Sequence, residues 1–402
     1  TCALPILLIL IASGIFSAMM KASGVADGLV FLGGMLHLTG HAFTVFVLLA
    51  SSLMAAATGS SIGTLLAAMP IFFPAGVALG ADPAMLAGAV LSGAIFGDNL
   101  APVSDVTVIS SVTQRFRNGT PADIAGVVRT RLPYALIALA VSLPVYAFMG
   151  ESLPVSEAAL SGDASALLML VPVAVLIAVA VRTRDVLMAI SAGAVTGTAT
   201  GLLIGRLSFA TIFAAVDGRL SGFLISGISN VSPIILLCVT LFAFTGIVRE
   251  AGVPDMMAKA LEAGSAGRPS ALRTELFLSA ATLVVTTLFA AVTSASVALV
   301  GSLTDDIGRA SNVHPYRRSH ILSGLANSLP VLMPFSAFVL ITMAAVSGLE
   351  GAAAVTPFTL MTAAFYPIAL FLVFGFMVLT GTGRMMETPE PEAAEAKTAT
   401  AL

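Results

Sequence analysis

The chain has 402 residues, of which 58% are apolar and only 10% are charged, and its formal net charge is −3 at pH 7. Soluble domains carry about 25% charged residues, so this composition excludes an ordinary soluble protein and indicates a polytopic membrane protein surrounded by lipids. The small net charge and the lack of a basic cluster argue against nucleic acid as a partner.

Apolar runs of membrane-spanning length recur along the chain. Because it begins at Thr1, without an initiator Met or a charged amino-terminal region, we expect further residues to precede it. Two apolar segments outside the predicted spans, 24–40 and 208–227, are interrupted by Gly, Asp or Arg and are expected to form in-plane or re-entrant helices. The predicted spans are 3–20, 41–57, 61–79, 83–113, 132–149, 165–181, 185–205, 231–248, 274–293, 294–308, 320–346 and 362–381.

The fourth predicted span differs from the others because it carries two aspartates, Asp98 and Asp105. An aspartate at the centre of a bilayer costs about 2.5–3.5 kcal/mol even on a lenient scale. Gly97 has low helix propensity, and Pro102 cannot donate a hydrogen bond to the carbonyl four residues earlier. The sequence therefore predicts a broken helix that is unwound over 98–101.

Pro102 is predicted to begin the second half of this broken helix, with Ser104 and Asp105 in its first turn. Carbonyls, hydroxyls and carboxylates at one membrane depth form the kind of cation site that discontinuous transporter helices build. A structural alternative is that Asp98 caps the second half-helix and Asp105 complements its dipole. The cost of buried charge favours the cation site, with the cation held by the two aspartates.

Short motifs of the first half recur in the same order about 230 residues later, as an internal duplication would produce. Small residues are common in membrane helices, so the shared order carries the inference. The matched motifs are Ser13-Gly14-Ile15 with Thr245-Gly246-Ile247, Ala57–Ser61 with Val292–Ser296, Ser92-Gly93 with Ser323-Gly324, and Pro102-Val103-Ser104 with Pro334-Phe335-Ser336.

Basic residues fall on opposite loops in the two copies. The connection 114–131 holds several arginines, whereas its counterpart 346–361 holds no Lys or Arg. Conversely, 249–273 and 309–320 are rich in basic residues and their first-half counterparts are poor in them. By the positive-inside rule, the copies lie upside down relative to one another. Both 114–131 and 249–273 are then expected to be cytoplasmic.

We therefore predict an all-α polytopic membrane protein with about 10–12 transmembrane helices in two inverted-topology repeats with discontinuous helices. The expected parts are a first repeat over 1–113 with the acidic broken helix, linker spans over 114–230, a second repeat over 231–346, a final transmembrane helix over 347–383 and a disordered acidic tail over 384–402.

Each half of the chain also contains hydroxyl and amide side chains, which lie in a hydroxyl cluster or near its predicted broken helix. The carboxylates do not repeat in the second half, so one half supplies negative charge and the other neutral oxygens. Close helix packing and hydrogen bonding to the helix's own carbonyls is the alternative role for the hydroxyls. The candidate ligands besides the two aspartates are Asn99, Ser104, Thr58, Ser60, Ser61, Thr293, Ser294, Asn327 and Ser336.

Other polar residues have weaker patterns. Asp82 before Pro83 is typical of a helix cap. Asp305 and Asp306 lie near Arg309 at the end of a span, so a paired or solvated role is favoured over transport. The four histidines, His37, His41, His314 and His320, are placed in connections, where pH sensing is conceivable but uncommon.

The segment Phe96-Gly97-Asp98-Asn99-Leu100-Ala101-Pro102-Val103-Ser104-Asp105, preceded by Ala57-Thr58-Gly59-Ser60-Ser61, resembles the NhaC family of sodium/proton antiporters. The resemblance implies a cation/proton exchanger of the bacterial or archaeal inner membrane, in which Asp98 and Asp105 match the acids of the family motif. Two hydroxyls of the family pattern are replaced here, by Ala101 and Val106. No cofactor is implied, because sodium and protons are the transported species.

Two alternatives stay open. The same scaffold could carry a carboxylate or an amino acid coupled to sodium or protons, with half-helices starting near Pro102 and Pro334 cradling the carboxylate. Against it, 41–114 and 274–308 contain no Lys or Arg. An intramembrane aspartyl protease would need Asp105 folded back beside Asp98 to share a proton. Nothing in the sequence decides between a monomer and a homodimer.

Overall fold

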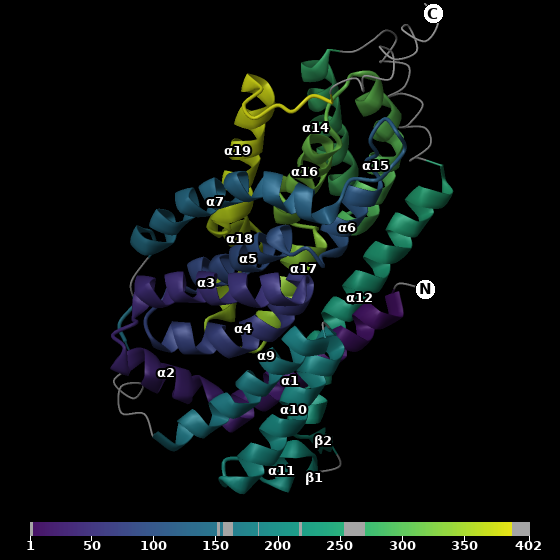
Figure 1. Cartoon of the computed structure of the whole chain (residues 1–402). Coiled ribbons are helices and arrows are strands. Elements are labelled where there is room, and N and C mark those ends of the chain that lie inside the picture. The colour runs from purple at the N-terminus through teal and green to yellow at the C-terminus, as the bar shows by residue number, and fades with distance from the viewer. Residues whose placement is uncertain are drawn as a thin grey trace, which may run out of the picture.

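The computed structural model describes residues 3–150, 153–155, 164–183, 185–216, 219–252 and 270–387. Helices account for nearly all the secondary structure of these ranges (Figure 1). The exception is one antiparallel hairpin of β1 (Ala214–Val216) and β2 (Arg219–Ser221), in which Ala215 pairs with Leu220. The all-α prediction is confirmed.

The helices follow one another along the described parts of the chain. The first half contains α1 (Ala3–Ser23), α2 (Val25–Met35), α3 (Gly40–Thr58), α4 (Ser61–Ala78), α5 (Pro83–Leu100) and α6 (Asp105–Val112). After it come α7 (Ile124–Phe148), η1 (Ala164–Met169), α9 (Leu170–Thr183), α10 (Val186–Leu203) and α11 (Phe209–Ile212). The remainder contains α12 (Phe223–Glu250), α14 (Ala271–Leu288), α15 (Thr293–Ala310), α16 (Pro315–Ala326), η2 (Leu329–Leu332), α17 (Ala337–Val346), η3 (Ala352–Ala354), α18 (Pro357–Ala363) and α19 (Phe365–Thr380).

The described helices are long and apolar enough for five membrane spans, or up to eight if each bent pair is one span. The bent pairs are α1 with α2 (64°), the α16–η2 segment with α17 (54°) and α18 with α19 (55°). The predicted 10–12 spans exceed this number because 167–183, 187–203, 223–232 and 293–302 form shorter apolar helices. With broken helices present as predicted, the chain is a multi-pass integral membrane protein.

One of the two interrupted segments is not the helix that was expected. Residues 24–40 contain α2, which is bent away from α1. The segment 208–227, by contrast, holds only the single turn of α11, the β1–β2 hairpin and the start of α12. A capping box between Ser208 and Thr211 closes that turn, and Gly222, with a φ of 107°, redirects the chain into α12.

The helices pack as two groups, and each group contacts one helix from the other half of the chain. In Figure 1, α3, α4 and α5 form one group and α14, α15 and α16 another, and α6 and α17 lie between them. Helix α4 of the first group contacts α17, and α15 of the second group contacts α6. This reciprocal exchange is the contact pattern that a duplication would produce. The inversion of the two copies in the membrane stays a prediction.

Helices α1 and α12 cross where Gly14 meets Gly227. A Cβ at Gly14 would lie 2.4 Å from the carbonyl oxygen of Gly227, and a Cβ at Gly227 would lie 2.6 Å from that of Gly14. Ser226-Gly227-Ile228 repeats Ser13-Gly14-Ile15, whereas a Cβ at Gly246, the predicted counterpart, would have no neighbour within 4 Å among the described residues. The backbone approach permits only glycine at this crossing.

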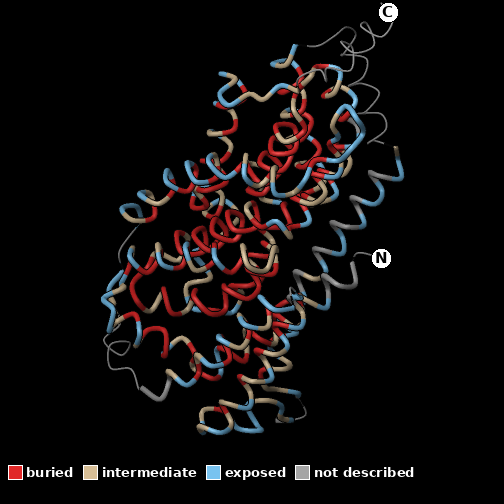
Figure 2. Tube along the Cα trace, in the orientation of Figure 1, coloured by how far each residue is buried: buried red, intermediate tan, exposed pale blue. Residues whose placement is uncertain are grey.

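Burial is concentrated at the centre of the bundle, as the red segments of Figure 2 show. Of an apolar 18-residue window within Pro83–Val112, the segment that contains α5 and α6, 89% of the residues are buried, compared with 22% for such a window within Ile124–Phe148. Exposed apolar side chains such as Leu136, Ile137 and Val141 line the outer face of α7, where they suit lipid. Helix α5 is therefore well enclosed, and Asp98 near its end is shielded from lipid.

Candidate ion-binding site

The break in the acidic helix lies three residues later than the predicted 98–101. Helix α5 stays helical through Leu100, and the non-helical stretch is 101–104. Asp98 is thus in the last turn of α5, and Pro102 lies inside the break instead of beginning α6. The missing N–H of Pro102 still explains the end of the helix, because residue 102 cannot donate to the carbonyl of Asp98, which instead accepts a hydrogen bond from the N–H of Ala101 at 3.2 Å.

Gly97 has a packing role that the sequence did not reveal. A Cβ at this position would lie 2.1 Å from the carbonyl oxygen of Ser52, so the glycine allows α5 to pack directly on the backbone of α3. Because the helix continues past Gly97, the prediction that this residue loosens it is wrong. The close approach instead fixes the height at which Asp98 leaves α5.

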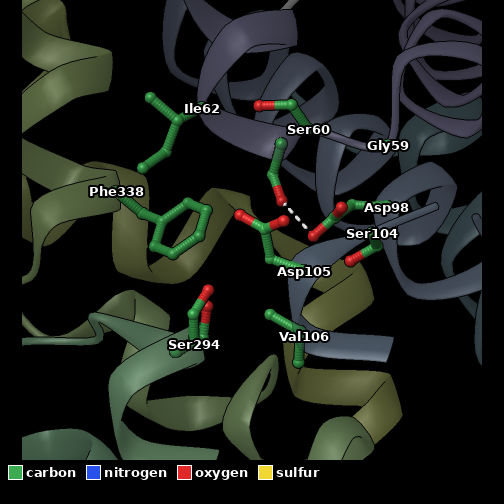
Figure 3. A pocket seen from close by; sticks show the side chains of 11 residues that line it. Gly59, Ser60, Ile62, Asp98, Ser104, Asp105, Val106, Ser294 and Phe338 are labelled. Carbon is green, nitrogen blue, oxygen red and sulfur yellow. Dashed lines mark hydrogen bonds between the residues drawn. The ribbon is translucent and has the colours of Figure 1, made fainter. Parts of the chain in front are cut away.

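Asp98 is almost completely buried, at 5% exposure, and has one hydrogen bond to another side chain. The hydroxyl of Ser61 donates to Oδ2 of Asp98 at 2.6 Å (Figure 3). Ser61 is the first residue of α4, and Ser60 caps that helix by accepting a hydrogen bond from the N–H of Gly63 at 3.1 Å. The amino terminus of α4 therefore points a hydroxyl at the carboxylate.

Asp105 begins α6, as predicted, and the cap residue before it is Ser104. In Figure 3 the carboxyl groups of Asp98 and Asp105 point toward one another across a cavity of about 100 Å³. Asp105 is an exposed residue, whereas Ser104 is buried and its hydroxyl has no hydrogen-bond partner. The lining residues are Gly59, Ser60, Ser61, Ile62, Asp98, Ser104, Asp105, Val106, Thr293, Ser294 and Phe338.

Four helices begin at this cavity: α4, α6, α15 and α17 contribute residues from their first turns to the lining. The amino terminus of a helix carries a partial positive charge and favours nearby anions. Backbone with positive φ precedes two of these starts, at Gly59 before α4 and at Ala290 and Ala291 before α15. For alanine this conformation is uncommon and is a feature of functional sites.

The cavity brings together seven of the predicted ligands, namely Asp98, Ser104, Asp105, Ser60, Ser61, Thr293 and Ser294, from both halves of the chain. Four others are not among its lining residues. Thr58 donates to the carbonyl of Met54 at 2.9 Å, and Ser336 caps α17. Asn99 donates to the hydroxyl of Tyr366 at 3.2 Å. Asn327 is buried, and its side-chain amide has no hydrogen-bond partner.

Arg131 is the feature that sequence reasoning missed. It was counted in the loop 114–131, but α7 begins at Ile124, so Arg131 lies in a helix and is fully buried. Its guanidinium donates to the hydroxyls of Thr107 on α6 at 2.7 Å and Ser323 on α16 at 2.5 Å. Asp123, which caps α7, could have indicated this earlier helix start.

Arg317 and Arg318 were also misplaced, because α16 begins at Pro315 and buries both of them. Arg317 pairs with Glu275 at 2.9 Å, and Arg318 pairs with Asp305 at 2.8 Å. Such internal pairs are not loop charges, so they do not bear on orientation in the membrane. Asp305 also pairs with Arg309, and so does Asp306, which confirms the paired role expected for both aspartates.

The histidines are not all in connections. His320 is buried within α16, and His41 is the second residue of α3. Most of the basic loop 249–273, the tail after Glu387 and Cys2 lie outside the described residues. Within the described ranges, no group of three or more His, Cys, Asp and Glu side chains could hold a metal ion. A bound cation would therefore share two carboxylates with neutral oxygens.

Residues 2–151 match the model of the Na+/H+ antiporter family. The match is confined to the amino-terminal part of the chain. The matched region ends after α7 and includes α5, α6 and both aspartates. The family is one of transporters and not of enzymes, which agrees with the prediction and leaves the protease alternative without support.

Three curated relatives are similar over parts of the chain. The malate-2H+/Na+-lactate antiporter of Bacillus subtilis is 32% identical over 36% of this chain and 29% of its own length. The Na+/H+ antiporter NhaC of Alkalihalophilus pseudofirmus is 41% identical over 25% of this chain and 21% of its own length. An uncharacterized Na+/H+ antiporter of Haemophilus influenzae is 23% identical over 62% of this chain and 58% of its own length. The resemblance to NhaC proteins is confirmed.

Among solved structures, the YdaH transporter of Alcanivorax borkumensis matches with a TM-score of 0.39 and 12% identity, over 93% of this chain and 85% of that chain. The matches to the curated relatives cover less than two thirds of the length of each.

Proposed function

We propose that this protein is a secondary active antiporter of the prokaryotic plasma membrane that exchanges sodium, or another monovalent cation, for protons. The observation that carries the proposal is the cavity in which Asp98 and Asp105 face one another between the two halves of the chain. Two carboxylates without a cationic partner lining that cavity attract a cation or protons, because uncompensated charge is costly inside a membrane protein.

The chemistry of the lining suits sodium and protons as competing loads. Carboxylate and hydroxyl oxygens are hard ligands of the kind that alkali and alkaline-earth cations prefer. A sodium ion between Asp98 and Asp105 would draw its remaining ligands from hydroxyls such as Ser104 and Ser61 or from the backbone carbonyls of the break. A proton neutralises a carboxylate without needing any other ligand. Because sodium and the proton bind the same carboxylates, binding of either one displaces the other.

Alternating access would expose the cavity to each side of the membrane in turn. The contacts between α4 and α17 and between α15 and α6 join the two halves around the cavity, and they are the surfaces that must slide if the halves rock. Either load neutralises part of the site, whereas the empty site is too highly charged to be carried across. Exchange follows, since the halves move only when the site is occupied.

A proton-flux assay tests the proposal. Everted vesicles carrying the protein and a pH-sensitive dye would receive one cation at a time, and sodium is expected to release protons. Asp98→Asn and Asp105→Asn should each abolish this response while leaving a folded, inserted protein. Asp82→Asn is the matched control, because Asp82 only caps α5 at 2.9 Å from the N–H of Met85 and asparagine caps equally well.

The apparent sodium affinity of the unmutated protein should also weaken as the pH falls, because protons compete for the same oxygens. Full exchange in both Asn variants, or a sodium affinity that is indifferent to pH, would show that these aspartates are not the exchange site.

The second candidate function is transport of a small carboxylate coupled to sodium or protons. It is favoured by the four helix amino termini at the cavity, which suit an anion once a cation has neutralised the aspartates. A relative named as a malate-2H+/Na+-lactate antiporter adds weight to it. Counterflow of labelled malate and lactate in proteoliposomes separates the two functions, because a pure cation exchanger moves neither.

A further inference from the structure

Among the residues that the structure describes, the three largest fully buried side chains are all arginines, Arg131, Arg317 and Arg318. Two of them are neutralised by an adjacent carboxylate, since Arg317 pairs with Glu275 and Arg318 with Asp305. Arg131 differs, because its hydrogen bonds go to neutral hydroxyls and its Nε has no partner. A buried charge without a counter-charge is strongly destabilising, because it has lost its hydration and gained nothing in return. Arg131 therefore needs negative charge nearby.

That negative charge is available in the cavity. Arg131 donates to Thr107, which lies two residues after Asp105 on α6, so their Cα atoms are about 5–6 Å apart by helix geometry. Asp98 acts electrostatically on the guanidinium as well. Arg131 thus lies behind the first turn of α6, within electrostatic reach of Asp98 and outside the lining of the cavity.

Few other ionisable groups face Arg131 in the described part of the chain. Tyr366 of α19 and His320 of α16 interact with it electrostatically, and neither carries a negative charge at neutral pH. Arg317, further along α16, is neutralised by Glu275. The charge balance around the cavity therefore reduces to two carboxylates and one guanidinium.

We propose that Arg131 is a built-in counter-cation that offsets one of the two cavity carboxylates throughout the transport cycle, so that one sodium ion or one proton completes the neutral load. The proposal rests on the proposed exchange function and deepens it. Two carboxylates and one guanidinium give the empty site a charge of −1. Because arginine does not lose its proton in proteins, this offset is permanent, and exchange moves no net charge.

The same count of charges predicts how the site behaves when Arg131 is replaced by a neutral residue. In Arg131→Gln the empty site carries −2, and a sodium ion alone leaves it at −1. Sodium then crosses only together with a proton. Sodium-for-sodium counterflow, which needs no proton in the unmutated protein, would therefore require one in the variant.

The test measures labelled sodium counterflow in proteoliposomes, at equal pH on both sides, over an alkaline series. We expect a constant rate in the unmutated protein and a rate in Arg131→Gln that falls about tenfold per pH unit, as mass action requires for one essential proton. Arg131→Lys keeps the charge and should restore the constant rate. Thr107→Val and Ser323→Ala remove the hydrogen bonds and keep the charge, so both should also give a constant rate, whatever its size.

Several outcomes would overturn the inference. One is a constant rate in Arg131→Gln, and another is a falling rate in Thr107→Val, which would point to hydrogen bonding instead of charge. If Arg131→Gln does not fold, sodium/proton exchange by the unmutated protein is measured with and without an imposed membrane potential, and a rate that follows the potential contradicts the proposal. Absence of all sodium flux in the unmutated protein would instead overturn the exchange function itself.

Discussion

The two interrupted helices, α5–α6 and α16–η2–α17, take corresponding places in the two groups of helices, but their chemistry differs. The break in α5–α6 is lined by Asp98 and Asp105 and faces the cavity. The break between α16 and α17 bends the chain by 54° and contains no carboxylate. There Ser336 caps α17, and the N–H of Ala337 donates to the carbonyl of Ala290 at 2.9 Å.

The two breaks therefore resemble each other in interrupting a helix and differ in the charge that they carry. Both halves supply helix amino termini to the cavity, but the negative charge comes from one half alone. The charged residues of the second half are used elsewhere, in the pairs of Glu275 with Arg317 and of Asp305 with Arg318. We infer that a transported ion stays with the first half and that the second half forms the wall it moves against.

The largest expected effect concerns the sides of the membrane on which two connections lie, because labelling of a cysteine from one side is all or none. Single cysteines at Asn118 and Ala353, in a background without Cys2 and Cys238, should react with an impermeant thiol reagent from opposite sides. Both residues are exposed in connections, and Ala353 avoids the strained φ of 81° at Gly351. Labelling of both from the same side would remove the inverted relation on which the comparison of the two broken helices depends.

The next effect is on folding. Glu275→Gln should lower the free energy of unfolding by about 3–5 kcal/mol, because it leaves Arg317 buried without its counter-charge. Asp98→Asn should cost less stability than this, since Arg131 acts on Asp98 only at longer range and no described cation makes a direct ion pair with it. Thermal unfolding in detergent measures both, and Asp306→Asn is the control at an exposed ion pair worth at most about 1 kcal/mol. A stable Glu275→Gln protein would contradict the structural role of the second-half charges.

A smaller effect is expected at the prolines of the two breaks. Pro102→Ala restores a donor and lets the helix continue, so the carbonyls of the break move and transport should fall by about tenfold, equivalent to about 1.4 kcal/mol. Pro334→Ala should have less effect, because Ser336 and Ala290 hold that break by their own hydrogen bonds. Initial transport rates, measured at equal expression levels, test this expectation. An equal loss of transport in both variants would mean that the two breaks are equivalent.

Hydropathy and helix punctuation allowed every predicted span to be matched to a helix or a helix pair, and the two aspartates were found from their cost in a membrane. The tertiary role of the arginines could not be found in this way. Arg131, Arg317 and Arg318 stand at the edges of apolar runs, where sequence reasoning assigns basic residues to loops. Their burial depends on partners distant in sequence, such as Ser323 and Glu275.

The smallest effect concerns Asp123, a carboxylate outside the membrane spans that serves structure alone. Asp123 caps α7 through the N–H of Gly126 at 2.7 Å and accepts a hydrogen bond from the hydroxyl of Tyr316 on α16. These hydrogen bonds, led by that of Tyr316, lower the pKa of Asp123 below its usual value. The stabilisation is therefore present at neutral pH and is lost as the pH falls through the lowered pKa.

Asp123→Ala should cost about 0.5–2 kcal/mol at neutral pH, the range for a lost helix cap, and less in acid, where the carboxylate is already protonated. Asp123→Asn keeps a capping oxygen, so it should cost less at neutral pH and respond less to acid. Unfolding temperatures of the three proteins at pH 7 and in acid give the comparison. Since Asp123 is not among the residues that line the cavity, sodium-driven proton release should be normal in both variants. Lost exchange in a stable Asp123→Asn protein would mean that the join of α7 to α16 also governs transport.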